Sequence, residues 1–163
     1  MSKPGRIWGS LLLFVAAVSM ISLWLDTAES LTYFADGNIA YKVSYLTLFC
    51  PLVAIAAGVF CAVGIRAAAL GLAIAALVLN LVSTMSSALG DKLEYPDEFS
   101  VGWSLKYYFL GQGHNADDLP AFQPGVAAYG LVAPLLLVAA VGVIAVCVPR
   151  AFGAAGIANP PAV

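Results

Sequence analysis

Charged side chains are scarce in this sequence, and the long apolar stretches hold none of them. Charged residues make up 10% of the 163 residues, whereas hydrophobic residues make up 62%. Soluble domains of similar length carry roughly 25% charged and 45–50% apolar residues. The mean hydropathy of +0.94 agrees with this imbalance. These values exclude an ordinary water-soluble fold, and we expect the lipid bilayer to surround most of the chain.

Side chains that bind metals, haem or redox groups are also few. The single histidine, His114, lies outside the apolar stretches, so the chain alone cannot supply a bis-histidine haem site. Cys50, Cys61 and Cys147 form no Cys-x-x-Cys pair and are expected to be buried free thiols. The sequence also lacks a GxxxxGK loop and a basic patch. We therefore expect a protein that is not an enzyme, needs no cofactor or metal, and binds no nucleic acid.

Four apolar segments are long enough to cross a bilayer. They cover residues 7–25, 43–64, 67–89 and 126–148. As a helix the first would be about 28 Å long, close to the roughly 30 Å of the hydrocarbon core. The second and third are nearly continuous, so we expect a tight turn at Gly64, where glycine gives the backbone freedom. Because no segment contains Asp, Glu, Lys, Arg or His, a proton-coupled transport mechanism is disfavoured.

Basic and acidic residues separate to opposite sides of these segments. If the N-terminus is cytoplasmic, the basic residues on that side are Lys3, Arg6, Arg66 and Arg150. All nine acidic residues then fall in two outside loops, residues 26–42 and 90–125. The loops hold lysines too, but positive charge is denser in the short cytoplasmic segments, which is typical of the cytoplasmic side. Residues 149–163 would form a cytoplasmic tail.

The predicted fold is an all-α membrane protein. A single domain, residues 1–163, forms a four-helix transmembrane bundle with both termini in the cytoplasm. Its Ala-, Gly- and Val-rich composition suits a bacterial plasma membrane. Pro51 and Pro134 lie inside predicted helices, where each removes the hydrogen-bond donor for the carbonyl four residues earlier. We expect both prolines to kink or loosen the outer halves of their helices.

Both outside loops contain strand signals. The Asp-Gly step at residues 36–37 lies between β-prone residues, which is typical of a hairpin. In the second loop, apolar side chains occupy every second position from Phe99 to Phe109, and this alternation favours a strand within residues 96–110. A helix from Pro96, ended by Gly111, is the open alternative. With a strand, the two loops would form a small β-sheet over the bundle.

Polar residues mark one face of the third apolar segment. They are Asn80, Ser83, Thr84 and Ser87, at the spacing i, i+3, i+4 and i+7. The other polar residues at the same outer level are Ser19, Ser22 and Thr47. Such side chains commonly join membrane helices by hydrogen bonds. The functional alternative is an outward-facing polar cleft, lined by these residues, that binds a lipid or quinone-like amphiphile.

Aromatic residues of the second loop suggest another site. Phe99, Trp103, Tyr107 and Phe109 either pack within the loop or form a contact surface for a partner. Because no catalytic set is visible, we expect a non-enzymatic accessory or scaffold subunit of a membrane complex. Its partners would be the lipid bilayer and another membrane protein. The alternative is binding or transport of a small amphiphile in the cleft.

Overall fold

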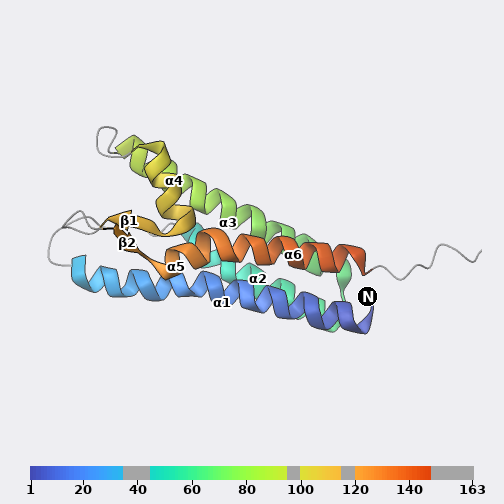
Figure 1. Cartoon of the computed structure of the whole chain (residues 1–163). Coiled ribbons are helices and arrows are strands. Elements are labelled where there is room, and N and C mark those ends of the chain that lie inside the picture. The colour runs from blue at the N-terminus through green and yellow to red at the C-terminus, as the bar shows by residue number, and fades with distance from the viewer. Residues whose placement is uncertain (35–44, 95–99, 115–119, 148–163) are drawn as a thin grey trace, which may run out of the picture.

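The computed structural model describes residues 1–34, 45–94, 100–114 and 120–147, and these are almost entirely helical (Figure 1). The helices are α1 (Lys3–Phe34), α2 (Tyr45–Val63), α3 (Arg66–Glu94), α4 (Val101–Leu110), α5 (Pro124–Ala127), the π-helical turn η1 (Ala128–Val132) and α6 (Ala133–Val146). Strands β1 (Gln112–His114) and β2 (Pro120–Phe122) pair antiparallel. The elements α5, η1 and α6 follow one another without a break and form a single rod.

Within the described part of the chain, three helices are long and apolar enough to cross a membrane. Their apolar stretches are Lys3–Leu23, Arg66–Gly90 and Pro124–Val146. In α2 the described apolar stretch, Thr47–Val63, is shorter. The expectation of a helical protein with long membrane-compatible helices is confirmed at this level, and α2 as a fourth crossing stays a prediction.

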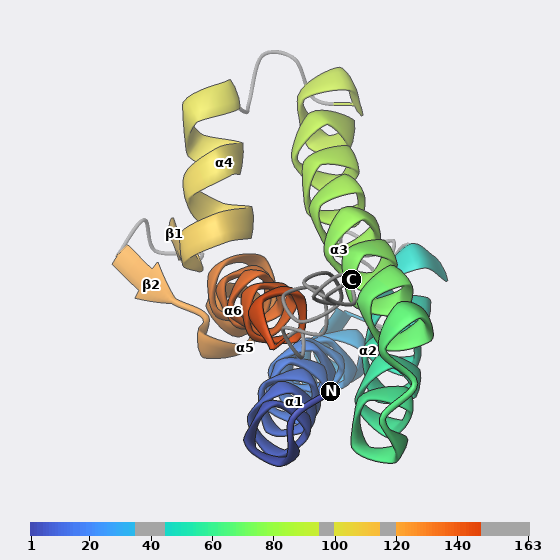
Figure 2. The ribbon, with the colours of Figure 1, turned by 90° about the vertical axis from the view of Figure 1, so that its right-hand side faces the viewer.

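Alanines form much of the interior, together with a few larger side chains such as Leu13, Met20 and Leu137, and many large apolar residues lie on the outside. Helix α1 packs against α2 and the rod, α2 packs against α3, and α3 packs against α6 (Figures 1 and 2). The fully buried alanines include Ala16, Ala54, Ala57, Ala73, Ala76, Ala133 and Ala140. Larger side chains such as Val18 and Leu135 point outward and are more than half exposed. Small residues let helix backbones approach closely, which is how helices associate without a hydrophobic drive between them.

The start of α1, the turn between α2 and α3, and the end of α6 meet at one end of the bundle, called here the inner end (Figure 1). A Cβ atom on Gly9 would lie 2.8 Å from the Cys61 sulfur, and a Cβ atom on Gly5 would overlap the Cys147 side chain. The expected turn is present at Gly64, whose φ of 95° favours glycine. The opposite end is called the outer end.

Arg66 joins α3 to the end of α6. Its Nε and Nη2 atoms donate hydrogen bonds to the carbonyl oxygens of Ile144 and Ala145, at 3.1 and 3.0 Å. These carbonyls lie in the last turn of α6, where a helix leaves acceptors without intrahelical partners and attracts positive charge. Arg66 therefore caps a helix from another segment.

The strand predicted in the second loop is wrong, because residues 101–110 form helix α4. The Ser100 hydroxyl accepts a hydrogen bond from the Trp103 backbone N–H at 3.1 Å and so caps the start of the helix. Gly111, with φ 65°, ends it, as the helical alternative expected. Two well-formed caps and burial against α3 and the rod outweigh the period-two pattern. Phe99 and Pro96 lie outside the described residues.

The predicted sheet between the two loops is also corrected. The observed strands β1 and β2 both belong to the second loop. Residues 31–34, expected to begin the first-loop hairpin, are the last turn of α1. The Asp-Gly step at residues 36–37 lies outside the described residues. The sheet is thus a local hairpin beside α4.

Candidate functional site

The polar face of α3 points into the protein. Asn80 and Ser83 are completely buried, and Thr84 is nearly so. Ser87 is half-buried. On the neighbouring helices, Thr47 is buried, whereas Ser19 and Ser22 are half-buried. The candidate cleft residues thus divide into an enclosed group on α3 and α2 and a more exposed pair on α1.

Four residues from three elements meet in the outer half of the bundle. Asn80 and Ser83 come from α3, Tyr129 from η1 and Cys50 from α2. The Tyr129 hydroxyl donates a hydrogen bond to the Cys50 sulfur at 3.4 Å, and the Asn80 and Ser83 side chains lie close to this hydroxyl. We call this group the polar centre. All four residues are buried.

The π-helical turn explains why Asn80 is needed. In η1 the Ala133 N–H donates to the carbonyl of Ala128, five residues earlier, and no longer serves the Tyr129 carbonyl. The next donor in a π pattern would be residue 134, which is proline and has no N–H. The Tyr129 carbonyl therefore loses its helical partner, and Asn80 Nδ2 donates to it at 3.0 Å.

Pro134 thus leaves a carbonyl without its helical hydrogen-bond donor, as expected, but the carbonyl is one residue away from the predicted one. We expected a free carbonyl at Gly130, four residues before the proline. The π turn shifts the pairing by one residue, so the carbonyl that Asn80 supports is that of Tyr129. Sequence reasoning missed Tyr129 and Cys50 as members of the site. The available signal was a tyrosine five residues before a proline in an otherwise apolar segment.

Within the described residues, two polar atoms of the polar centre have no hydrogen-bond partner. They are Asn80 Oδ1 and Ser83 Oγ, and each is inaccessible to solvent. An unsatisfied buried polar group costs about 1–3 kcal/mol in a folded protein. Such a group is found where a buried water, a ligand or a functional role accounts for it.

The remaining members of the candidate cleft bond mostly to their own helices. The Thr84 hydroxyl donates to the Asn80 carbonyl, the Ser19 hydroxyl to that of Val15, and the Ser22 hydroxyl to that of Ser19. These i−3 and i−4 bonds satisfy the hydroxyls locally. They bring no additional side chain into the polar centre.

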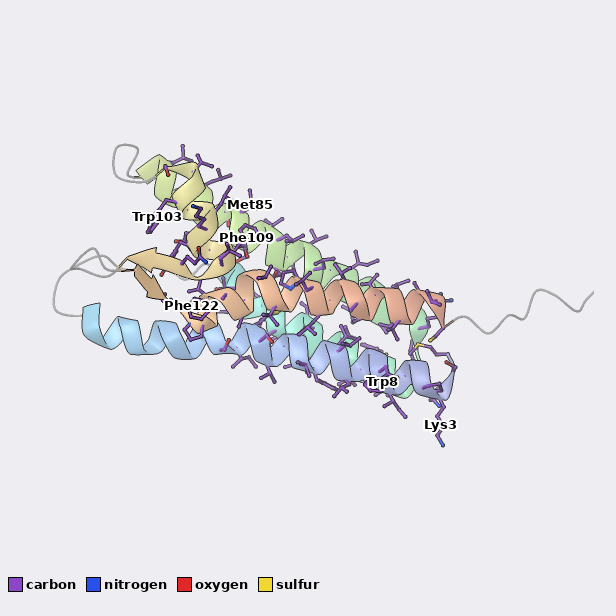
Figure 3. The ribbon with its side chains drawn as sticks, in the orientation of Figure 1. Lys3, Trp8, Met85, Trp103, Phe109 and Phe122 are labelled. Atoms are coloured by element: carbon purple, nitrogen blue, oxygen red, sulfur yellow. The ribbon has the colours of Figure 1, made fainter. Side chains whose placement is uncertain are left out.

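The candidate partner surface in the second loop is largely internal. Trp103 stacks on Tyr107 with ring centroids 5.3 Å apart and an interplanar angle of 6°. The Tyr107 hydroxyl donates to Gln123 Oε1 at 2.8 Å. Tyr107 is buried, and Trp103 and Phe109 are half-buried at the outer end (Figure 3). These side chains hold α4 against the segment leading into the rod, and Phe99 lies outside the described residues.

A glycine allows α4 to dock on the rod. A Cβ atom on Gly130 would overlap the Tyr108 carbonyl oxygen and come within 2.9 Å of the Phe109 Cα. Backbone therefore meets backbone where α4 crosses η1. The Gly111 backbone also lies close to the segment that leads into the rod, because the Gln123 N–H donates to the Gly111 carbonyl oxygen at 2.8 Å.

The polar centre and the docked helix α4 are the two features that distinguish this chain from a plain apolar bundle. The described residues contain no cluster of three or more His, Cys, Asp or Glu side chains that could hold a metal ion. The polar centre offers neutral hydrogen-bonding groups and a thiol, without a charged group. Compared with protein-family models, curated proteins and solved structures, the chain matches none.

Proposed function

We propose that this chain is a four-span protein of a bacterial plasma membrane that serves as a non-enzymatic accessory subunit of a membrane complex. Both termini would be cytoplasmic. Lys3, Arg6 and Arg66 gather at the inner end, and the positive-inside rule supports placing that end in the cytoplasm. Helix α2 lies between α1 and α3 and shares their apolar character, which supports a fourth crossing.

The observation that carries this proposal is a set of exposed apolar side chains spread over the elements of the outer end. Its members are Leu93 on α3, Val101 and Leu110 on α4, and Phe122 on β2, and their exposed fractions are 83%, 47%, 37% and 65%. Leu93 lies about 40 Å along α3 from Arg66, well beyond the roughly 30 Å of hydrocarbon. An apolar side chain that projects beyond the hydrocarbon, as we propose for Leu93, favours contact with another protein. We call this group the outer apolar surface.

The outer apolar surface replaces the aromatic set as the proposed contact region. Trp103 and Tyr107 hold α4 in position, whereas Val101 and Leu110 on the same helix face outward. The docked helix thus gives the exposed side chains a fixed placement. A partner that covers them would bury apolar area without ordering a flexible segment, which favours binding.

The proposal predicts a specific co-purifying membrane protein. Tagged wild-type chain, solubilised in a mild detergent, should elute with one partner in a fixed ratio. The double variant Leu93→Ser and Phe122→Ser should lose that partner while keeping its own elution volume. The matched control Val138→Ser changes an exposed apolar position on α6 and should retain the partner. Recovery of the wild type as a lone monomer or a pure homo-oligomer would contradict the proposal.

The orientation can be tested separately. Ile65 is exposed in the α2–α3 turn, so an Ile65→Cys variant presents a thiol at the inner end. A membrane-impermeant maleimide should label this cysteine only after the cells are opened. Labelling of intact cells would invert the assignment of the two faces.

A second candidate function is binding of a small amphiphile at the outer half of the bundle. The unpaired Asn80 Oδ1 and Ser83 Oγ atoms favour it, because both could accept a hydrogen bond from a headgroup. Native mass spectrometry of the detergent-purified protein would test this. A retained lipid or quinone that is lost in the Ser83→Ala variant supports the candidate, and a ligand-free wild type contradicts it.

A further inference from the structure

The two unpaired atoms of the polar centre lie on consecutive turns of α3, so they share one side of the helix. Asn80 Oδ1 is an amide oxygen and can only accept, while the Nδ2 group of the same amide donates to the Tyr129 carbonyl. Ser83 Oγ can both donate and accept. The Tyr129 hydroxyl donates to Cys50, and its oxygen is also an acceptor.

Together these groups fit one small hydroxyl-bearing molecule. A buried water needs two to four polar partners, and about three is typical. Here Asn80 Oδ1 and Tyr129 Oη can each accept a hydrogen bond from a water molecule, and Ser83 Oγ can donate a hydrogen bond to it. The groups are neutral, so the ligand should be neutral as well, because a buried unpaired charge costs far more than a buried dipole.

We propose that Asn80, Ser83 and Tyr129 together bind a single hydroxyl group inside the membrane-embedded part of the protein, with a water molecule as its primary source. This goes beyond the accessory-subunit function and holds whether or not a partner exists. The bound hydroxyl would satisfy Asn80 Oδ1 and Ser83 Oγ, both otherwise orphaned. It would also extend the hydrogen-bond chain from α3 through η1 to Cys50 on α2.

The direction in which Ser83→Ala changes the melting temperature tests this proposal. If Ser83 Oγ binds the hydroxyl, Ser83→Ala removes a partner from the ligand and should lower the melting temperature in detergent by about 2–4 °C. If no bound molecule satisfies Ser83 Oγ, the same change removes an unsatisfied polar group and should leave the melting temperature unchanged or raise it. The second result would overturn the proposal.

The matched control is Thr84→Val on the next position of α3. Its hydroxyl is also buried but donates to the Asn80 carbonyl of its own helix, so its loss should shift the melting temperature by less than half as much. An equal shift for both variants would mean that any hydroxyl deletion on this helix has the same effect, and would overturn the proposal.

A double-mutant cycle tests whether the residues share one molecule. In an Asn80→Leu background the ligand should already be lost, and Ser83→Ala should then cause no further loss of melting temperature. Additive shifts would overturn the shared site. If Asn80→Leu fails to fold, Tyr129→Phe replaces it in the same cycle, because it removes the third proposed partner and keeps the ring.

A last arm separates the two sources of the hydroxyl. Delipidated protein is titrated with phosphatidylglycerol micelles, whose glycerol headgroup carries free hydroxyls. If the melting temperature of the wild type rises more than that of Ser83→Ala, a lipid hydroxyl is the ligand and the second candidate function is supported. If the two respond equally and the Ser83→Ala deficit persists, water is the ligand, and the amphiphile function fails while the hydroxyl site stands.

Discussion

The inner and outer halves of this bundle are held together by different interactions. At the inner end, glycines face thiols and aliphatic side chains, and one arginine caps the end of α6. In the outer half, Asn80 donates a hydrogen bond to the carbonyl that the π-helical turn leaves without a helical partner. Helix α4 packs across this turn. The inner half combines close packing of glycines with one arginine cap, whereas the outer half combines a backbone-to-backbone helix crossing with the buried polar contacts of Asn80 and Tyr129.

This difference follows from the positions of the prolines and the polar residues. Pro134 prevents a regular hydrogen-bond pattern in the rod, and lipid supplies no water to satisfy the freed carbonyl. The chain provides Asn80 on α3 for that purpose. A departure from regular helix therefore requires polar side chains nearby, and those residues can then acquire a binding role.

The largest expected effect comes from filling the crossing of α4 and η1. A Gly130→Val variant would place a branched side chain where the Tyr108 carbonyl lies, so α4 must move away. Overpacking against backbone should cost about 3 kcal/mol of the free energy of unfolding. Thermal unfolding in detergent, followed by tryptophan fluorescence, measures this loss.

Gly142 provides the control on the same rod. A Cβ atom there would have nothing within 4 Å, so Gly142→Val should change the unfolding free energy by much less. If both variants unfold at the same temperature, α4 does not rest on Gly130 and the outer half is looser than the structure indicates.

A second test breaks the contact between α3 and the π turn. Asn80→Leu leaves the Tyr129 carbonyl unsatisfied in the low-dielectric interior, and we expect a loss of about 2 kcal/mol. Adding Pro134→Ala restores a backbone N–H at position 134, which can reach that carbonyl. The loss caused by Asn80→Leu should therefore be at least halved in the Pro134→Ala background, as measured by thermal unfolding of all four proteins.

The corresponding control uses the other helix proline. Pro51 lies in α2 and does not bear on the Tyr129 carbonyl, so Pro51→Ala should give no rescue of Asn80→Leu. Rescue by both substitutions would show a general stabilisation by proline removal. It would refute the specific pairing of Asn80 with Pro134.

The inner half can be weakened in a comparable way. Arg66→Gln removes the charged donor from the Ile144 and Ala145 carbonyls and should cost about 1.5 kcal/mol, since these bonds are charge-assisted and the side chain is half-buried. Arg66→Lys should lose roughly half of that, because lysine keeps the charge but not the planar fork. Hydrogen exchange at the end of α6 should increase in the same order. Equal exchange in all three proteins would mean that Arg66 is not a cap.

The sequence predicted the apolar helices and the polar face of α3, but not the contacts that define the polar centre. Spacing placed Asn80 and Ser83 on one side of a helix, which the structure bears out. The π turn could not be foreseen, because the regular helical pattern assigns the proline's lost bond to Gly130 rather than Tyr129. Cys50 joins the site only through the way α2 packs, which no local pattern encodes.

Helix α4 shows why a periodic pattern can mislead. Apolar residues at every second position suit a strand, yet Trp103 and Tyr107 are four residues apart and stack on one helical face. Tyr107 is buried by the neighbouring segments, and the intervening Ser104 is buried as well. Alternation would place Ser104 on the face opposite Trp103 and Tyr107, yet the three lie on one side of the helix, and that side is the buried one.

The smallest expected effect concerns the cap that helped decide between helix and strand. Ser100→Ala removes the hydroxyl that accepts the Trp103 N–H, and should destabilise α4 by about 1 kcal/mol, whereas Ser100→Asp should preserve the helix because aspartate caps equally well. Hydrogen exchange of the α4 amides reports this local change, and Ser86→Ala, which deletes a hydroxyl bonded within α3, serves as the control. Unchanged exchange in Ser100→Ala would mean that docking on Gly130 alone holds the helix. Backbone packing would then stabilise both ends of the bundle. The polar bond of Asn80 would be the remaining difference between the two halves.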